Sequence, residues 1–261
     1  MDIYTHALSG LAVGTVAGVF AKKLHPGCFL LSGAFAATLP DVDVISLWSK
    51  FDGTFGKVFG LTHRGVDIYS GKFWYSHHAF FHSLVAALLF ASLFVSILYF
   101  IKLRKNKTIP LRDYGLLFAA FLTAYGIHLW EDMPTPASAW GGVNLLWPLK
   151  TYTGGTGKIW WWNNYDLFLI ALSVSAVNGV LLLFRRRLKS RAGRLSLLVF
   201  IMGLGLGIYQ IHHRQTDYAY TGFTKKFDTL EQQSIKEQQR ILNKPLFDAM
   251  RRFDRRVPGN F

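Results

Sequence analysis

Long apolar segments with almost no charge alternate with short basic segments along this chain of 261 residues. A helix that crosses a bilayer needs roughly 17–25 predominantly apolar residues. Segments 84–101, 115–130, 165–184 and 195–211 reach or approach that length, and two shorter ones, 7–21 and 28–40, suit short or tilted spans. The pattern predicts an all-α, polytopic helical membrane bundle of about six spans with outer loops.

The composition of the chain changes after residue 217. Segment 227–243 is polar and helix-prone, and Leu246, Met250 and Phe253 follow helical spacing. We therefore expect a transmembrane domain at 1–217 that holds the chemistry, and an extracytoplasmic amphipathic tail at 218–261. The basic face of the tail either lies near anionic lipid or a partner, or is a solvated surface.

The distribution of basic residues sets the orientation. A net charge of +14 would suit nucleic acid, but 13 of the 29 basic residues lie between apolar spans, in segments 22–23, 102–112 and 185–194. Cytoplasmic loops of membrane proteins carry such an excess of Lys and Arg. We place these segments in the cytoplasm and expect no nucleic-acid partner. Residues 1–5 carry no basic residue, so no cleavable signal peptide is expected.

In this orientation all eight tryptophans lie toward the outer side, which is typical of side chains at a membrane interface. The ionisable residues that suit chemistry lie on the same side, although they come from four different spans: His6, Asp41, Asp43, His77, His78, His82, His128 and Asp132. A random distribution would divide them between the two faces. The topology therefore predicts one site at the non-cytoplasmic ends of the helices.

His128 and Asp132 are four residues apart at the end of one span, so they share a helix face. An imidazole nitrogen and a carboxylate oxygen placed in this way suit a divalent ion such as zinc. The alternative is an interface histidine beside a helix-ending aspartate. His6 begins the first span at the same face, and its interpretation as a ligand rests on the neighbouring clusters.

Three histidines, His77, His78 and His82, lie within six residues at another span boundary. Ionisable groups are costly at such a boundary and usually functional, so we predict metal ligands. His78 and His82 are also four residues apart, the spacing of one helix face. A wet, hydrogen-bonded interface cluster is the alternative.

Pro40 should end the second span and leave Asp41 and Asp43 in a loop. In an extended loop the two carboxylates point the same way, and we predict Asp41 as a ligand. Asp43 or Glu131 is the candidate for proton transfer; a solvated helix exit is the alternative for the aspartates. Arg64 can hold an anionic substrate group bidentately, unless residues 62–65 form a simple turn.

The motifs also occur in a familiar order. Asp2-x-x-Thr5-His6-Ala-Leu-x-Gly10 is followed by Leu39-Pro40-Asp41-Val42-Asp43, the block from His77 to His82-Ser83, His128-x-x-x-Asp132, and Leu146-Trp147-Pro148. Over residues 1–150 this order resembles the bacterial inner-membrane proteins known as LexA-regulated, membrane-bound, metal-dependent hydrolases. That family is thought to be distantly similar to zinc-dependent phospholipase C and the P1-type nucleases.

The resemblance implies one or two divalent ions, zinc above all, and hydrolysis of a phosphoester. Its usual block reads His-Arg-Gly-x-Thr-His-Ser, and this register selects His77, whereas helix spacing selects His78. Both stay open as ligands. The Arg and Gly of the block are missing here, although His63-Arg64-Gly65 lies upstream.

We expect hydrolysis by a metal-activated water. Because the site lies at the outer interface of an inner membrane, membrane lipids are the expected partners and a lipid-like phosphoester the expected substrate. The alternative is a non-enzymatic metal-binding scaffold or a transporter. Transport predicts ionisable residues at mid-membrane depth, but these spans are apolar at their centres.

Overall fold

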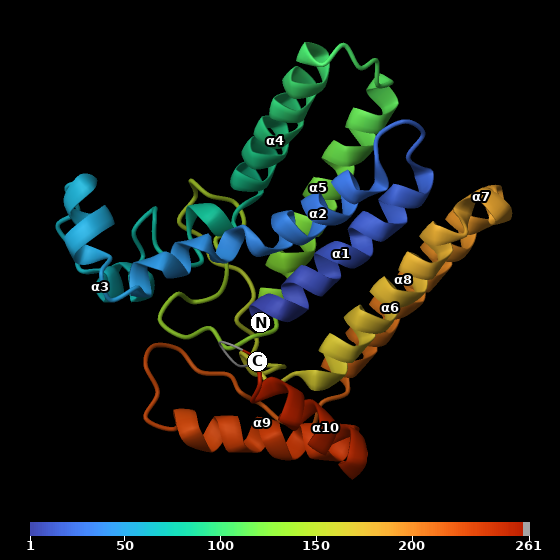
Figure 1. Cartoon of the computed structure of the whole chain (residues 1–261). Coiled ribbons are helices and arrows are strands. Elements are labelled where there is room, and N and C mark those ends of the chain that lie inside the picture. The colour runs from blue at the N-terminus through green and yellow to red at the C-terminus, as the bar shows by residue number, and fades with distance from the viewer. Residues whose placement is uncertain (258–261) are drawn as a thin grey trace.

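A computed structural model describes residues 1–257. Within that range the chain is helical, without strands and with three isolated β-bridges. Six long helices correspond to the six expected spans: α1 (Ile3–Phe20), α2 (Pro26–Thr38), α4 (Leu84–Arg104), α5 (Leu111–Asp132), α6 (Tyr165–Leu183) and α8 (Ser190–His212). Figure 1 shows them as an open bundle, with the C-terminal segment across its lower end.

Four of the described helices, α1, α4, α6 and α8, are long and apolar enough to cross a membrane alone. A fifth span results if α2 and the following 3-10 helix η1 (Pro40–Leu47), bent by 50° from it, count as one. Helix α5 has 22 residues but is less apolar, because it carries charged and polar side chains at both ends. The prediction of an all-helical membrane bundle is confirmed.

Helix α1 lies at the centre and contacts α2, α5, α6 and α8. Its closest neighbour is α2, because two glycines remove the side chains at their crossing. A Cβ added at Gly10 would lie 2.2 Å from the carbonyl oxygen of Gly33, and one added at Gly33 would lie 2.2 Å from that of Gly10. Small residues of this kind let membrane helices bring their backbones together.

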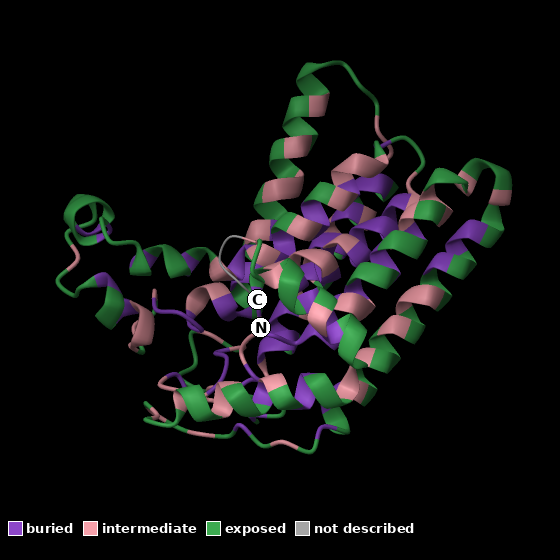
Figure 2. Ribbon diagram, turned by 60° about the horizontal axis from the view of Figure 1, so that its bottom comes forward, coloured by how far each residue is buried: buried purple, intermediate pink, exposed green. Residues whose placement is uncertain are grey.

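The lipid-facing helices are α4 and α8. In the apolar 18-residue stretch of each helix, only 17% of the residues of α4 and 11% of those of α8 are buried inside the protein. In Figure 2 the buried residues concentrate in the centre of the bundle, while α4 and the hairpin of α6 and α8 are exposed on their outer faces. Apolar side chains on these faces suit contact with acyl chains.

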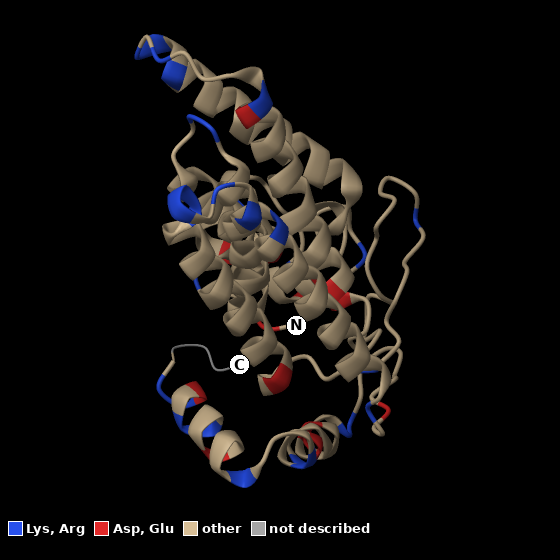
Figure 3. Cartoon of the chain, turned by 90° about the vertical axis from the view of Figure 1, so that its right-hand side faces the viewer, with Lys and Arg blue, Asp and Glu red and all other residues tan. Residues whose placement is uncertain are grey.

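The three basic segments lie together at the upper end of the bundle, two of them in the loops that join α1 to α2 and α4 to α5, the third around α7 (Arg185–Leu188) (Figures 1 and 3). One acidic side chain organises this end. The carboxylate of Asp113 accepts hydrogen bonds of 2.7–3.2 Å from the backbone N–H groups of Lys22, Lys23 and Leu24. The start of α5 is thereby fixed to the α1–α2 loop.

The opposite end carries an arm and the C-terminal tail. The arm includes the π-helical turn η2 (Asp52–Gly56) and α3 (Gly65–Ser70), and it leads through the 3-10 turn η3 (Phe80–His82) into α4. Helices α9 (Phe227–Ile241) and α10 (Lys244–Asp254) lie across the lower end of the bundle (Figure 1). The tail forms two helices, as predicted, within the residues that the structure describes, and residues 258–261 of the predicted tail lie outside them.

Hydrogen bonds of α9 and an apolar contact of α10 attach the tail to the bundle, and a buried ion pair fixes the segment that leads into the tail. Nη2 of Arg214 donates to both carboxylate oxygens of Asp166, at 2.7 and 2.9 Å. Phe247 and Met250 of α10 are buried against Tyr165 and other side chains of α6. Of the three apolar residues at helical spacing, Met250 is buried, whereas Leu246 and Phe253 are 39% and 47% exposed.

Candidate metal centre

Three separate elements bring four of the predicted ligands together. Asp41 comes from η1, His82 from η3, and His128 and Asp132 from the last turn and a half of α5. One ligand atom from each of these four residues lies within 4.8 Å of the others. The histidines and Asp132 are buried, while the Asp41 side chain is 15% exposed. The convergence at one end of the bundle agrees with the prediction from topology.

The spacing of these four atoms suits a small tetrahedral ion. Nε2 of His82 and Nε2 of His128 are 3.2 Å apart, and Oδ2 of Asp132 lies 3.5 and 3.1 Å from them. Oδ1 of Asp41 lies 3.6 and 3.7 Å from the same two nitrogens. Tetrahedral zinc with bonds of about 2.0–2.1 Å separates its ligands by roughly 3.3–3.4 Å. Two nitrogens and two carboxylate oxygens therefore fit such an ion.

Four histidines use the same ring nitrogen to bind the protein. Nδ1 of His128 donates to the carbonyl oxygen of Ala37 at 2.7 Å, and Nδ1 of His78 to that of Gly142 at 3.0 Å. In His6 and His77 the Nδ1 atoms lie 2.7 Å from carboxylate oxygens of Glu131 and Asp43. A metal-ligating histidine typically donates its second N–H to a carboxylate or carbonyl in this way, which leaves Nε2 available.

His6 completes the buried end of the centre. Its Nε2 lies 3.3 Å from Oδ1 of Asp132 but is not aligned for a hydrogen bond, so this buried nitrogen has no hydrogen-bond partner among the described residues. The His6 ring also lies against that of His128, with centroids 3.8 Å apart. The amino group of Met1 contacts the same Asp132 oxygen. An orphaned buried nitrogen beside a shared carboxylate is consistent with His6 as a ligand.

A second group consists of His77, His78 and His82, and His82 belongs to both groups. Nε2 of His82 faces the four-residue group, whereas its Nδ1 lies 3.6 Å from Oδ2 of Asp43. The prediction that His78 and His82 share a helix face is wrong. Residues 77–83 form no α-helix, because only Phe80–His82 make a 3-10 turn and His78 adopts a left-handed φ of 62°. The structure nevertheless keeps both His77 and His78 near His82.

The expected extended loop after Pro40 is also replaced by a 3-10 helix, η1. Asp41 and Asp43 therefore do not alternate as in a strand. They approach His82 from opposite sides, Asp41 at 3.6 Å from Nε2 and Asp43 at 3.6 Å from Nδ1. Pro40 does end α2 as predicted, since it starts the new helix.

Charge in this region follows the histidine–carboxylate pairing. Burial would lower the pKa of His82, but the carboxylates of Asp132, Asp41 and Asp43 hold it well above its ordinary value. Burial would raise the pKa of the Asp43 carboxyl, yet His77 and His82 lower it to about 2. The centre therefore holds ionised carboxylates that would favour a cation.

Two of the predicted site residues, Glu131 and Arg64, make contacts that do not fit the roles predicted for them. Glu131 accepts from the Ser9 hydroxyl at 2.5 Å as well as pairing with His6. Arg64 lies in the arm with a side chain 72% exposed, paired with Asp67 at 2.9 Å. It is not among the residues that line the cavity beside the centre.

That cavity, of about 770 Å³, opens directly onto the centre. Asp41, His77, His78 and Asp132 line one side, and aromatic residues from distant segments line the rest, among them Tyr69, Trp140, Trp161, Trp162, Tyr220 and Phe227. From the sequence, the tryptophans were expected only at the membrane interface. Their position after the span that carries His128 and Asp132 was the one sequence feature that could have placed them beside the site. Their contacts with histidines, such as 4.6 Å between the ring centroids of His78 and Trp140, depend on the folded loop.

Residues 1–215 match the family model described as YdjM inner membrane protein. The chain belongs to this family. Its members are inner-membrane proteins, which agrees with the apolar helices of the fold. The comparisons with curated proteins and with solved structures gave no match. Every residue of the candidate centre lies within the matched range.

Proposed function

We propose that this protein is a membrane-bound, metal-dependent hydrolase that cleaves a lipid-like phosphoester at the non-cytoplasmic face of the inner membrane. The observation that carries the proposal is the common orientation of the histidines. Four of them use Nδ1 for a carbonyl or carboxylate. His128 and His82 lie with the carboxylates of Asp41 and Asp132, and His77 and His78 lie with His82, beside a large cavity. Such an arrangement is typical of catalytic metal centres with ligands held by outer hydrogen bonds.

The residues proposed to hold one divalent ion, zinc by preference, are Asp41, His82, His128 and Asp132, with His6 beside them. His77 and His78 would complete a second group with His82. A catalytic zinc ion keeps one position for a water, so turnover would require one of these four side chains to leave the ion or the ion to accept a fifth ligand. The ion would then lower the pKa of that water to about 7 and polarise the scissile group. The mixture of nitrogen and oxygen ligands supports zinc over magnesium or calcium, which prefer oxygen alone.

Asp43 and Glu131 take a different role from the one expected for them. Each carboxylate lies 2.7 Å from the Nδ1 of a histidine, so we propose that they orient His77 and His6. An outer carboxylate of this kind fixes the tautomer and raises the basicity of the ligand. The role of Arg64 in substrate binding stays a prediction. In the structure Arg64 lies in the arm, where it pairs with Asp67.

The orientation in the membrane supports a non-cytoplasmic site. The basic segments lie at the upper end of the bundle and the centre at the lower end (Figures 1 and 3). Cytoplasmic loops carry the excess of Lys and Arg, so the centre would face the other side. A site at a helix end reaches lipid head groups, which supports a phospholipid substrate and speaks against a transport path with ligands at mid-membrane depth.

The proposal is tested with purified protein in nanodiscs that contain a phospholipid labelled in its head group. We expect the labelled head group to be released, and this release to stop when a chelator is added. The rate of release should fall by about a hundredfold or more in His128→Ala. His213→Ala is the matched control, because His213 is exposed and contacts only Tyr209 of its own helix. If the wild type binds metal but releases no head group, the protein is a metal-binding scaffold and the proposed hydrolase activity is refuted.

A further inference from the structure

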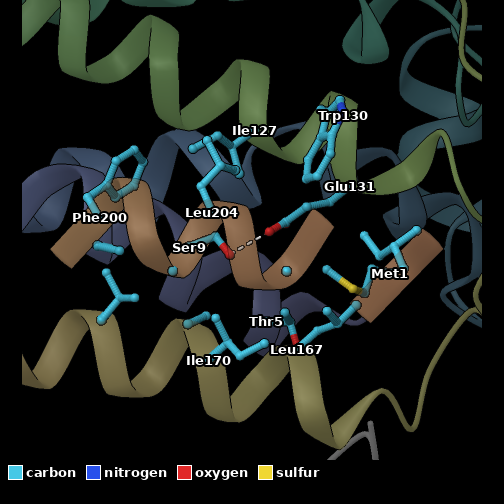
Figure 4. A pocket seen from close by; sticks show the side chains of 16 residues that line it. Met1, Thr5, Ser9, Ile127, Trp130, Glu131, Leu167, Ile170, Phe200 and Leu204 are labelled. Carbon is cyan, nitrogen blue, oxygen red and sulfur yellow. Dashed lines mark hydrogen bonds between the residues drawn. The ribbon is translucent and has the colours of Figure 1, made fainter. Parts of the chain in front are cut away.

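An apolar cleft lies between α1, α5, α6 and α8, beside the metal centre but separate from the large cavity (Figure 4). Its walls include Ile127 and Trp130 of α5, Ile170 of α6, and Phe200 and Leu204 of α8. The cleft is half-open, and its enclosed part of about 70 Å³ takes only part of the width of an acyl chain. It forms because α8 packs against α6 and α1, which leaves a gap on the side of α5.

The polar end of the cleft reaches the metal centre. Glu131 lines it and points toward Ser9, as the dashed bond in Figure 4 shows. The next residue, Asp132, lines the large cavity, and Met1 lines both spaces. A molecule with one end in the cleft would therefore have its other end beside the metal ligands.

The length of the cleft matches one leaflet of a bilayer. Its lining on α8 runs from Phe200 to Ile211, a distance of about 16 Å at a rise of roughly 1.5 Å per residue. The hydrocarbon core is about 30 Å thick, so this is about half of it. The cleft starts at the helix end that carries the centre and ends near mid-membrane, where only acyl chains are available to fill an apolar gap between spans.

We propose that this cleft binds one acyl chain of a membrane lipid, which enters between α5 and α8 and places its head group at the large cavity. Chain binding stands on the cleft alone, whereas cleavage of the head group rests on the proposed function. The lipid would enter the protein sideways, directly from the surrounding bilayer.

Two glycines of α8 provide a matched test. A Cβ added at Gly207, which lines the cleft, would meet nothing within 4 Å, and the same is true of Gly205, which is exposed and does not line it. A leucine at 207 should fill the cleft without displacing a neighbour, and a leucine at 205 should face the surrounding lipid. Gly203 is unsuitable, because its added Cβ would lie 2.2 Å from Val174.

The experiment uses the full-length protein in nanodiscs of phosphatidylethanolamine and phosphatidylglycerol, with a trace of phosphatidylglycerol that carries a diazirine within one acyl chain. After illumination, mass spectrometry maps the labelled peptides. We expect enrichment at Ile127, Trp130 and Leu204, a loss of about tenfold in Gly207→Leu because the chain no longer buries its methylenes there, and unchanged labelling in Gly205→Leu. Equal melting curves of the two variants establish that both fold.

Equal labelling of the cleft in the two variants, or uniform labelling of all lipid-facing helices, would overturn the inference. The assay needs no turnover, so it is repeated on metal-free protein, where labelling should persist. Cleft labelling without head-group release would refute the hydrolase and sustain the chain site. Head-group release without cleft labelling would do the reverse.

Discussion

At the residue scale, four histidines of the candidate centre use Nδ1 for a contact with the protein and would use Nε2 for an ion. His6 shows the arrangement most clearly, since Glu131 holds Nδ1 and Nε2 is buried without a hydrogen-bond partner among the described residues. Glu131 is in turn held by Ser9. Metal binding at the proposed centre would therefore depend on residues that do not touch the ion.

Replacing Glu131 tests this dependence. In Glu131→Ala the His6 ring loses its orienting partner, and metal affinity should fall by about 10–100-fold, the effect typical of outer-sphere partners. Competition with a chromophoric chelator measures the affinity. Asp248→Ala is the control, because Asp248 is paired only with Lys244 on the exposed face of α10. The same affinity in both variants would remove Glu131 from the centre.

The pH dependence of metal binding follows from His82. Its neighbouring carboxylates outweigh burial and hold its pKa well above the ordinary value, so the metal-free form carries a proton there at neutral pH. A protonated imidazole cannot ligate, and metal binding must release that proton. Affinity should therefore rise with pH by about tenfold per unit for each proton released, up to the pKa of His82. Calorimetry in two buffers counts the protons, and binding without proton release would contradict the assignment.

At the scale of the elements, the backbone contact between α1 and α2 places His6 and Asp41 at the same end. Gly10 and Gly33 allow it. In Gly10→Leu the side chain would meet the carbonyl of Gly33, and overpacking should cost about 1–3 kcal/mol or more of unfolding free energy. Gly179→Leu in α6 is the control, since its Cβ meets nothing within 4 Å. Thermal unfolding in detergent should separate the two variants; equal midpoints would mean that the contact is dispensable.

A buried ion pair between Arg214 and Asp166 of α6 fixes the segment that leads from α8 into the tail. Removing the Arg214 guanidinium leaves the Asp166 carboxylate buried without its partner, which costs roughly 3–5 kcal/mol. We expect Arg214→Ala to release α9 and α10 and to make the tail sensitive to protease. Lys244→Ala removes only an exposed pair with Asp248 in α10 and should leave the tail resistant. Resistance in both variants would show that the apolar contact of Phe247 suffices.

At the scale of the whole molecule, the account requires the basic loops and the centre to lie on opposite sides of the membrane. In a Cys28→Ser background, a cysteine at Phe223, which is 84% exposed, should react with an impermeant maleimide in spheroplasts. A cysteine at Asn106, in the exposed α4–α5 loop, should react only after lysis. The reverse pattern would invert the topology.

The helical bundle and the set of residues that form the candidate centre could both be predicted from the sequence, for the same physical reason. Bilayer spans need long apolar runs, and loop charge fixes their direction, so every span end acquires a side before any packing is known. This argument grouped His6, His82, His128 and Asp132, which the structure brings together. Even α5, the least apolar of the six, was recognised from its central run.

The local geometry of the centre could not be predicted, because it depends on contacts between distant segments. His78 has a left-handed φ and bonds to Gly142, and nothing in its neighbourhood along the chain specifies either feature. The pairing of Asp43 with His77 spans 34 residues of chain, most of it the arm. Hydrophobic periodicity reports helices, and it carries no information on which ring nitrogen faces a partner.

The metal content of the purified protein tests the central claim most directly. Elemental analysis of wild type, His128→Ala and His213→Ala, purified without chelator, should find one or two divalent ions per chain in the wild type and in His213→Ala, and a loss in His128→Ala, whose Nε2 lies 3.2 Å from that of His82. A wild-type protein without metal, or equal content in all three proteins, would contradict the account.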